Sequence, residues 1–211
     1  MVDGRLDEPD WCRAGRMKLQ KVLSSPHDRL PLRESTQVAA LWDQQALYLA
    51  FEIDDKEVWA TLTSHNERLF QEECVEVFID PGGDGSCYIE AQINSLNTMR
   101  DLLVDGSVND PTRAQFDRMA QWHFKSLSSA VNIRPGLGWT LEMAIPWNEL
   151  SFSGRNLPPI PGSVLRANFC RYERSKSGEQ PLELSAWSPV RSSFHEPERF
   201  GKLVFEEAQQ Y

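Results

Sequence analysis

Short segments in which apolar and polar side chains alternate recur along this chain, and turn-forming residues separate them. In Gly138–Ile145, for example, large apolar side chains occupy every second position. A period of two is typical of strands with one buried face, whereas no long segment carries the 3.6-residue period of a helix. The pattern predicts an all-β fold. We expect an antiparallel β-sandwich of jelly-roll-like or immunoglobulin-like layers with a few short helical turns.

The segments expected to form strands combine this alternation with β-branched and aromatic residues. They are 19–23, 36–42, 46–53, 58–61, 74–80, 87–94, 98–105, 131–134, 138–145, 164–172, 182–187 and 200–205. Polar or proline-containing segments at 67–73, 107–121 and 146–150 predict loops or short helical turns. A chain of 211 residues with 40% hydrophobic residues is long enough to bury a core, as one large domain or two small ones.

Two of the expected strands, Cys74–Asp80 and Cys87–Asn94, are joined by a glycine-rich turn and place polar side chains on one shared face. The opposite face carries aliphatic residues and is expected to be core. The polar face combines Glu76 of the first strand with alternate residues of the second, namely Tyr88, Glu90, Gln92 and Asn94. Such a row of hydrogen-bonding groups suits a polyhydroxylated ligand.

The formal net charge of −9 excludes broad classes of partner. Phosphate backbones and anionic membrane surfaces repel an acidic protein, so no nucleic-acid partner is expected. Membrane insertion is not expected either, because no apolar run approaches the roughly 20 residues that span a bilayer. The acidic N-terminus is not a signal peptide. The protein is therefore cytoplasmic or extracytoplasmic with its signal absent from this chain, and the second reading is slightly favoured. The sequence does not indicate the oligomeric state.

The cysteines are Cys12, Cys74, Cys87 and Cys170. An even number permits two disulfides in a secreted protein. Strand parity, however, points Cys74 and Cys87 to opposite faces, which is poor geometry for pairing. Four free and mostly buried thiols are favoured.

Several motifs in a fixed order resemble those of the family 9 carbohydrate-binding modules and their family 9-like (DOMON-like) relatives. They are the lead-in Asp3–Trp11, Ala46–Phe51 followed by Asp54-Asp55, Val75–Asp80, Gly138–Trp147, Ala167–Phe169, Ala186–Pro189 and Phe194–Leu203. The order extends over most of the chain. The resemblance implies a single sandwich domain over residues 1–211 that binds a mono-, oligo- or polysaccharide and has no catalytic role.

The resemblance also assigns roles to individual positions. In the family, two tryptophans clamp a terminal sugar, and their positions correspond here to Phe70 and Phe194. The strand glutamate of the family matches Glu76, and its polar second strand matches Gln92 and Asn94. An arginine on that second strand in the family is replaced by Asn94 here.

The predicted sugar site needs flat rings for the apolar faces of a sugar and fixed donors and acceptors for its hydroxyls. Phe70, Glu76, Tyr88, Glu90, Gln92, Asn94, Asn97, Asn168, Arg171 and Phe194 are the candidate ligand-binding residues. Ordinary structural roles stay open for them. The glutamates are alternatively solvated or paired with Arg100, Arg166 or Arg171, the amides line a half-exposed sheet, and the phenylalanines belong to the core.

An enzyme is the first alternative. Neighbouring strands lie about 4.8 Å apart. If Glu76 and Glu90 face each other, their carboxyl groups approach the roughly 5–5.5 Å separation found in retaining glycosidases.

A haem-binding DOMON-like domain is the second alternative, because some similar sandwiches hold haem through His and Met. No ligand pair is recognisable among His27, His65, His123 and His195.

No cofactor is expected apart from a possible structural calcium ion, which the family resemblance suggests. The weak metal candidates are Asp54, Asp55, Asp80 and Asp84, which cluster near turns.

Overall fold

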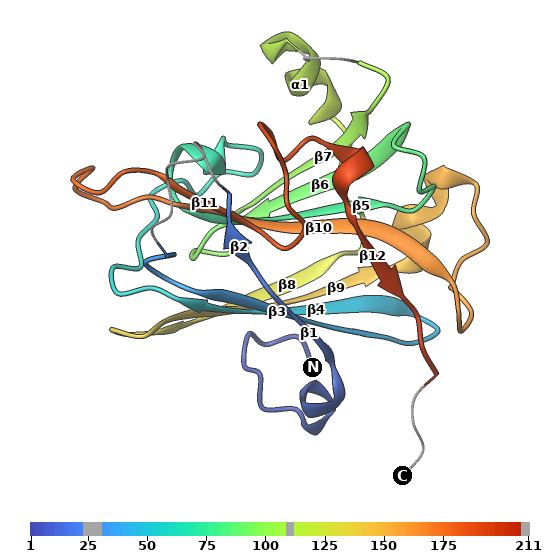
Figure 1. The fold of residues 1–211 in the computed structure, drawn as a ribbon, viewed down its shortest axis with the longest axis horizontal. Coiled ribbons are helices and arrows are strands. Elements are labelled where there is room, and N and C mark those ends of the chain that lie inside the picture. The colour runs from blue at the N-terminus through green and yellow to red at the C-terminus, as the bar shows by residue number, and fades with distance from the viewer. Residues whose placement is uncertain (23–30, 109–111, 208–211) are drawn as a thin grey trace.

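The computed structural model describes residues 1–22, 31–108 and 112–207, which form two antiparallel sheets packed face to face (Figure 1). The expected all-β sandwich is therefore confirmed. The strands are β1 (Gly15–Lys18), β2 (Gln20–Lys21), β3 (Thr36–Trp42), β4 (Ala46–Asp54), β5 (Cys74–Asp80), β6 (Cys87–Ile93), β7 (Met99–Asp105), β8 (Ser128–Arg134), β9 (Gly138–Pro146), β10 (Val164–Glu173), β11 (Glu183–Ala186) and β12 (Gly201–Val204).

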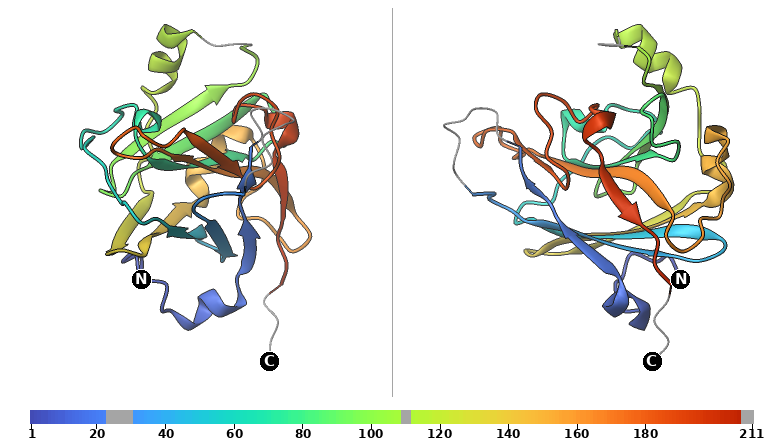
Figure 2. Two further views of the ribbon diagram at one scale, coloured as in Figure 1. Left: turned by 60° about the vertical axis from the view of Figure 1, so that its left-hand side comes forward. Right: turned by 45° about the vertical axis from the view of Figure 1, so that its right-hand side comes forward.

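The first sheet has the strand order β1-β3-β4-β9-β8, and the second has the order β2-β11-β10-β5-β6-β7, with β12 also pairing with β10. The two views in Figure 2 show these sheets as separate layers. Strand β5 lies in the middle of the second sheet, between β10 and β6, whereas β7 is its edge strand. The polar face expected from the sequence thus belongs to the centre of one sheet.

Short helices join or flank the strands. They are η1 (Pro9–Arg13), η2 (Leu69–Gln71), α1 (Arg113–Met119), η3 (Trp147–Ser153) and η4 (Pro197–Arg199). The α-helix begins with a capping box, in which the side chains of Thr112 and Gln115 each accept the other's backbone N–H. It follows β7 and extends from the top of the sandwich in Figure 1. The helical turns expected near 70, 115 and 148 are confirmed.

Two strand predictions differ from the structure. Residues 58–61 form no strand, because their polar groups bond to other segments in place of a neighbouring strand. The backbone N–H of Thr61 donates to the Glu72 carboxylate at 2.8 Å, and the Trp59 indole donates to the carbonyl of Arg174. The strand expected at 19–23 is limited to β2 within the described residues, and Leu23 lies outside them.

The main core lies between the sheets and is built from the inward-facing residues of both. In β5 the side chains of Val75, Val77 and Ile79 are fully buried, as their alternation predicts. Across the interface the rings of Phe51 and Phe169 pack edge to face with centroids 5.9 Å apart. Burying each large apolar side chain contributes about 1.5–3 kcal/mol, so this interface holds the two sheets together.

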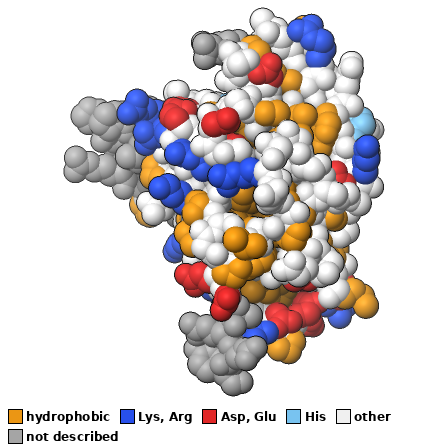
Figure 3. Space-filling model, turned by 90° about the vertical axis from the view of Figure 1, so that its right-hand side faces the viewer, with side chains coloured by type: hydrophobic (Ala, Val, Ile, Leu, Met, Phe, Trp, Pro, Cys, Tyr) orange, Lys and Arg blue, Asp and Glu red, His pale blue; other side chains and the backbone are white. Residues whose placement is uncertain are grey.

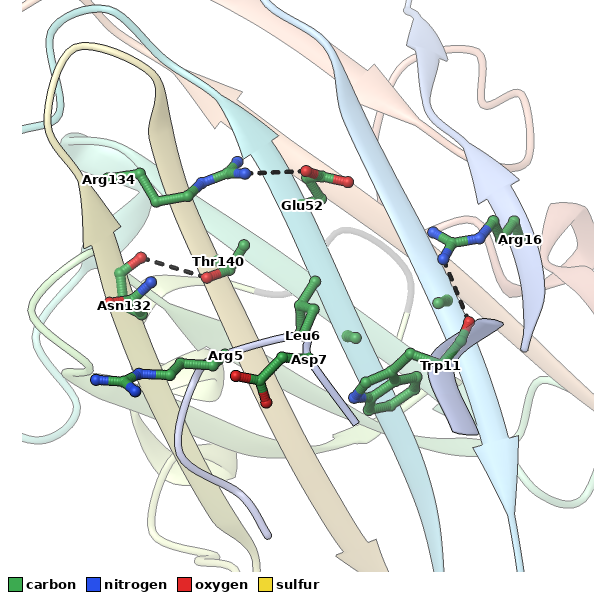
Figure 4. A pocket seen from close by; sticks show the side chains of 11 residues that line it. Arg5, Leu6, Asp7, Trp11, Arg16, Glu52, Asn132, Arg134 and Thr140 are labelled. Carbon is green, nitrogen blue, oxygen red and sulfur yellow. Dashed lines mark hydrogen bonds and ion pairs between the residues drawn. The ribbon is translucent and has the colours of Figure 1, made fainter. Parts of the chain in front are cut away.

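The N-terminal segment packs on the outer face of the first sheet. Trp11 is buried there, and its indole N–H donates to Glu142 at 2.9 Å. The second Glu142 oxygen accepts the backbone N–H groups of Asp3 and Gly4. Gly4 has φ +83°, and a Cβ there would lie 2.7 Å from the backbone of Val131, so only glycine fits. A charged surface hollow remains beside Trp11 (Figure 4).

The surface carries separate exposed apolar residues, and on the side shown in Figure 3 hydrophobic side chains gather near the middle. Ile160, before β10, is 72% exposed, and Val204 on β12 is 56% exposed. Isolated exposed residues of this kind are ordinary on proteins. Among the described residues, no helix is long and apolar enough to cross a membrane.

Candidate functional site

The outer face of the second sheet gathers polar side chains from its three strands β5, β6 and β7. Glu76 lies opposite Gln92, and Gln92 lies opposite Arg100 on the edge strand. Glu90 lies two residues before Gln92 and so shares its face. These four side chains form the polar cluster. They are only 2–5% exposed, although each carries a charge or a full set of hydrogen-bonding groups.

The polar face is covered by apolar side chains, so it is not the open row of hydrogen-bonding groups that the two strands alone suggest. Phe78, on the same face, forms a second apolar cluster with Tyr88 and with Phe194 and Phe200 of the C-terminal part of the chain. Phe116 of α1 packs against this cluster. The covering residues come from segments outside β5 and β6, and Phe194 and Phe200 lie more than 100 positions beyond them, so strand parity alone did not reveal this cover.

Acceptor groups in the polar cluster are left without hydrogen-bond donors. Gln92 donates from Nε2 to Glu90 Oε1 at 2.5 Å, while its Oε1 is buried and has no partner. The carboxylate of Glu76 makes no hydrogen bond to any described residue. Unpaired buried acceptors cost about 1–3 kcal/mol each, so a ligand that donates hydroxyl protons here would recover that energy.

The electrostatics of the cluster follow from its burial. Burial, reinforced by the negative charge of Glu90, raises the pKa of Glu76 well above its ordinary value. The positive charge of Arg100 opposes this rise. Arg100 itself is anchored through Nη1, which donates to the carbonyl of Asn66 at 2.7 Å. Arg100 is a residue that sequence reasoning treated only as an ion-pair partner, although its alternation with Leu102 and Val104 could have placed it here.

Aromatic rings lie beside the polar cluster. Phe70 is half-buried, and its ring centroid lies 6.1 Å from that of Tyr172. The ring of Phe194 also packs against Tyr172, edge to face, with centroids 5.3 Å apart. The two positions inferred from the resemblance are thus brought together through Tyr172, which the sequence analysis did not select. The parity of β10 would have found it, because Tyr172 is paired with Cys74 two residues before Glu76.

His195 is a second polar residue that the sequence analysis did not assign to this site. Its Nδ1 lies 3.0 Å from the Tyr88 hydroxyl, and its Nε2 lies 3.4 Å from Glu90 Oε2. Tyr88 is buried, and burial raises the pKa of its hydroxyl. His195 therefore ties the covering segment to the strand that carries Glu90.

Three predicted amide residues are engaged in holding the backbone. Asn94 Oδ1 accepts the N–H groups of Leu96 and Thr98 and so shapes the turn between β6 and β7. Asn97 lies in that turn with φ +60° and donates to a carbonyl of β8. Asn168 bonds to the backbone of Ser188 in both directions. The structure thus gives these amides structural partners and does not leave them free for a ligand.

Arg171 does not reach the polar face, which corrects its selection as an outer ligand-binding residue. It pairs across β10 and β5 with Val75, whose side chain points into the core. Its guanidinium group is 2% exposed and lies 2.5 Å from Glu73, with Glu173 in contact and Asp55 at 3.9 Å. Burial raises the pKa of Glu73 and of Glu173, the positive charge of Arg171 opposes this rise, and the nearby Asp55 carboxylate adds to it.

The register excludes the face-to-face pair of glutamates on which the enzyme alternative depended. Glu76 is opposite Gln92, and Glu90 is opposite Phe78, so the two carboxylates are diagonal neighbours. Glu90 is also occupied by Gln92 and His195. The arrangement is that of a packed polar cluster and not of two opposed carboxyl groups.

The cysteines are unpaired, as expected. Cys74 and Cys170 are buried on the same face as Glu76, Cys87 is half-buried, and Cys12 is exposed. Burial, together with the nearby carboxylates of Glu76 and Glu90, raises the pKa of both buried thiols. They are therefore protonated and serve as small core residues.

The four aspartates expected near turns do not converge on one point. Both oxygens of Asp80 accept N–H groups of its own turn, and Asp84 accepts two bonds from Ser86. Asp54 accepts the hydroxyl of Ser35. Asp55 belongs to the cluster around Arg171. A structural calcium ion stays a prediction, and a rise in Tm on adding calcium would support it.

Comparison with known proteins identifies a family. Residues 13–205 match carbohydrate-binding family 9. The chain belongs to that family. Membership confirms the resemblance seen in the sequence and the expectation of carbohydrate binding.

Individual relatives are distant. Endo-1,4-beta-xylanase A of Thermotoga maritima is 26% identical over 207 residues, covering 96% of this chain but 16% of that protein. The enzyme of the same name from Thermotoga neapolitana is 21% identical over 209 residues, covering 96% of this chain and 17% of that protein. The chain thus spans about a sixth of the length of the curated relatives it matches.

Solved structures share the fold. A family 9 module from Caldicellulosiruptor kristjanssonii in complex with cellotriose superposes with a TM-score of 0.69 at 16% identity, covering 99% of this chain and 90% of that one. A putative carbohydrate-binding protein from Bacteroides uniformis gives 0.68 at 22% identity, covering 93% and 88%.

Proposed function

We propose that this family 9 domain binds the terminal unit of a β-linked glucan or xylan on the polar face of its second sheet, without catalysing a reaction. The observation that carries the proposal is the polar cluster itself. Gln92 Oε1 is a buried acceptor without a partner among the described residues, the Glu76 carboxyl group accepts no hydrogen bond from them, and Arg100 lies opposite Gln92 as a donor. Sugar hydroxyls both donate and accept, so they complement this set.

A terminal unit suits the geometry better than the interior of a polysaccharide chain. The face is walled by the segment carrying Phe194 on one side and by the loop carrying Phe70 on the other, and Tyr172 joins the two rings. Arg68 of that loop forms an ion pair with Asp117 of α1 at 3.1 Å. A sugar would reach Glu76 only when these covering side chains move aside, and a covered face admits the end of a chain more readily than its interior.

The proposed class of ligand is based on the similar solved structures and on the relatives in sequence. Family 9 structures contain cellotriose and glucose, and the curated relatives are xylanases. Such polymers lie outside the cell, which agrees with an extracytoplasmic location. As part of a longer protein, a domain of this kind would hold an enzyme near its polysaccharide.

Titration calorimetry tests the proposal with glucose, cellobiose, cellotriose, xylobiose and borohydride-reduced cellotriose. We expect saturating heat with cellotriose and a dissociation constant on the order of micromolar to millimolar. Loss of binding on reduction would identify the reducing end as the unit recognised. Absence of heat across all five sugars would refute the proposal. Release of reducing sugar from xylan, lost in Glu76→Gln, would instead support the enzyme alternative.

A further inference from the structure

Two histidines far apart in the sequence meet one carboxylate at the edge strand β7. His65 Nε2 lies 2.9 Å from Asp101 Oδ1, and His123 Nδ1 lies 3.3 Å from the same oxygen. The two ring nitrogens are 3.2 Å apart. Three potential ligand atoms therefore form a nearly equilateral triangle. The sequence analysis considered these histidines only as haem ligands and did not bring the two together.

The size of the triangle matches the coordination shell of a small divalent ion. Zinc binds imidazole nitrogen at about 2.0–2.1 Å and carboxylate oxygen at about 2.0–2.2 Å. Neighbouring ligands at tetrahedral to octahedral angles are then separated by about 2.9–3.4 Å. All three observed separations fall within this range. An ion placed to one side of the triangle reaches each atom without any movement of the backbone.

Protons satisfy these three atoms less well than a metal ion does. A neutral imidazole carries one N–H, and a proton on a ring nitrogen bridges one pair of atoms at a time. When both rings donate to Asp101, the two N–H groups face each other across the 3.2 Å gap. A cation accepts a lone pair from all three atoms at once, so it resolves the conflict.

The carboxylate is positioned for this role by its surroundings. Asp101 is 1% exposed, and its other oxygen, Oδ2, accepts the backbone N–H of Phe124 at 2.8 Å. Oδ1 is thereby directed at the two rings. The backbone N–H of Asp101 donates to Asn66, whose amide also donates to the carbonyl of Ala120 at 2.8 Å. Bonds of this kind orient metal ligands in proteins and strengthen their affinity.

The exposure of the rings leaves room for further ligands. The side chains of His65 and His123 are 50% and 49% exposed. Two nitrogens and one carboxylate oxygen, with water completing the shell, suit zinc and the neighbouring first-row divalent metals. Calcium prefers six to eight oxygen ligands and is a poor match.

We propose that His65, Asp101 and His123 form a binding site for one zinc ion or a comparable divalent transition-metal ion. The site joins the loop before η2, the edge strand β7 and the segment after α1. It lies apart from the aspartates first considered for calcium, and its ligands do not belong to the polar cluster. Bound metal would cross-link three segments that are otherwise held by hydrogen bonds, so it would stabilise this edge of the sandwich.

Titration of the full chain with zinc chloride tests the site, using protein without a polyhistidine tag. The exposed thiol of Cys12 is first removed as Cys12→Ser, because a free thiolate also binds zinc. We expect one zinc ion per chain by calorimetry and a rise in Tm. Cobalt(II) should give visible absorption bands of a nitrogen- and oxygen-ligated ion. Zinc chloride added to the cobalt-loaded protein should remove these bands. Calcium chloride at the same concentration should not remove them.

Variants of the half-exposed rings separate this site from adventitious binding. His65→Ala and His123→Ala should each lower zinc affinity at least about tenfold and abolish the rise in Tm, while the metal-free Tm changes little. Asp105→Asn removes an exposed carboxylate at the end of the same strand and should leave the affinity unchanged. Equal zinc affinity in the parent and both histidine variants, or no binding in the parent, would overturn the proposal.

Discussion

The carboxylate of Glu76 is the most informative group to change, because its charge is buried and no described residue donates a hydrogen bond to it. The side chain is 3% exposed, and both burial and Glu90 raise its pKa. Glu76→Gln keeps the shape and one acceptor oxygen but removes the charge. Glu76→Leu keeps the approximate volume and removes both. The pair of variants separates the contribution of charge from that of hydrogen bonding.

The expected effects on sugar affinity follow from the strength of the bonds. A hydrogen bond to a charged group contributes about 1.5–3 kcal/mol, and a neutral one about 0.5–1.5 kcal/mol. If the donors of the bound sugar ionise this carboxyl group, Glu76→Gln loses the difference, about 1–1.5 kcal/mol, so the affinity should fall about 5- to 12-fold at about 1.4 kcal/mol per factor of ten. Glu76→Leu loses the whole bond, and the affinity should fall about 10- to 150-fold.

The two variants should also change how the free energy of unfolding depends on pH. Because the pKa of Glu76 is raised in the folded protein, its contribution to stability is complete below the unfolded pKa near 4.5 and is lost as the pH rises toward the folded pKa. Neither variant titrates at this position. The free energy of unfolding should therefore decline less between acid and neutral pH in the variants than in the wild-type protein.

Calorimetry with cellotriose and urea denaturation at several pH values measure the two effects. Glu207→Gln, at an exposed position, is the matched control and should change neither. Unchanged cellotriose affinity in a folded Glu76→Leu protein would refute the role of the carboxylate in binding. A large loss of stability with unchanged affinity would show instead that Glu76 is a structural residue.

Three further changes test other parts of the structure. Arg171→Leu leaves buried carboxylates without their partner and should lower the free energy of unfolding by about 3–5 kcal/mol in urea denaturation. Phe70→Ala should weaken cellotriose binding about 2- to 12-fold by loss of ring stacking, worth about 0.5–1.5 kcal/mol, whereas Phe70→Trp should retain or strengthen it. Gly138→Ala should lower Tm markedly in a thermal scan, because at φ +137° its Cβ would lie 1.9 Å from the carbonyl oxygen of Ile53.

The sequence predicted the architecture well because alternation is a local property. The inward residues Val75, Val77 and Ile79 are fully buried, and Glu76 and Gln92 share the opposite face. The failures were at 58–61, where side-chain and loop partners replaced a strand ladder, and near the N-terminus, where β1 (Gly15–Lys18) was not predicted and the strand expected at 19–23 is limited to β2.

The site was predicted less completely, because parity says which way a side chain points but not what covers it. Phe194 and His195 close over Tyr88 and Glu90 from more than 100 residues away in sequence. Arg171 carries the residue type of a sugar ligand, yet its strand position turns it between the sheets.

By itself the sequence determined the two-layer fold, the side of β5 and β6 that carries the polar groups, and the family, since periodicity and motif order are written along the chain. Tertiary structure alone decided that the polar face is enclosed, that Tyr172 joins Phe70 to Phe194, and that two distant histidines meet at Asp101. Those outcomes depend on contacts between segments far apart in sequence. The packing of the two sheets sets the distance between such segments, and a pattern along the sequence does not contain that distance.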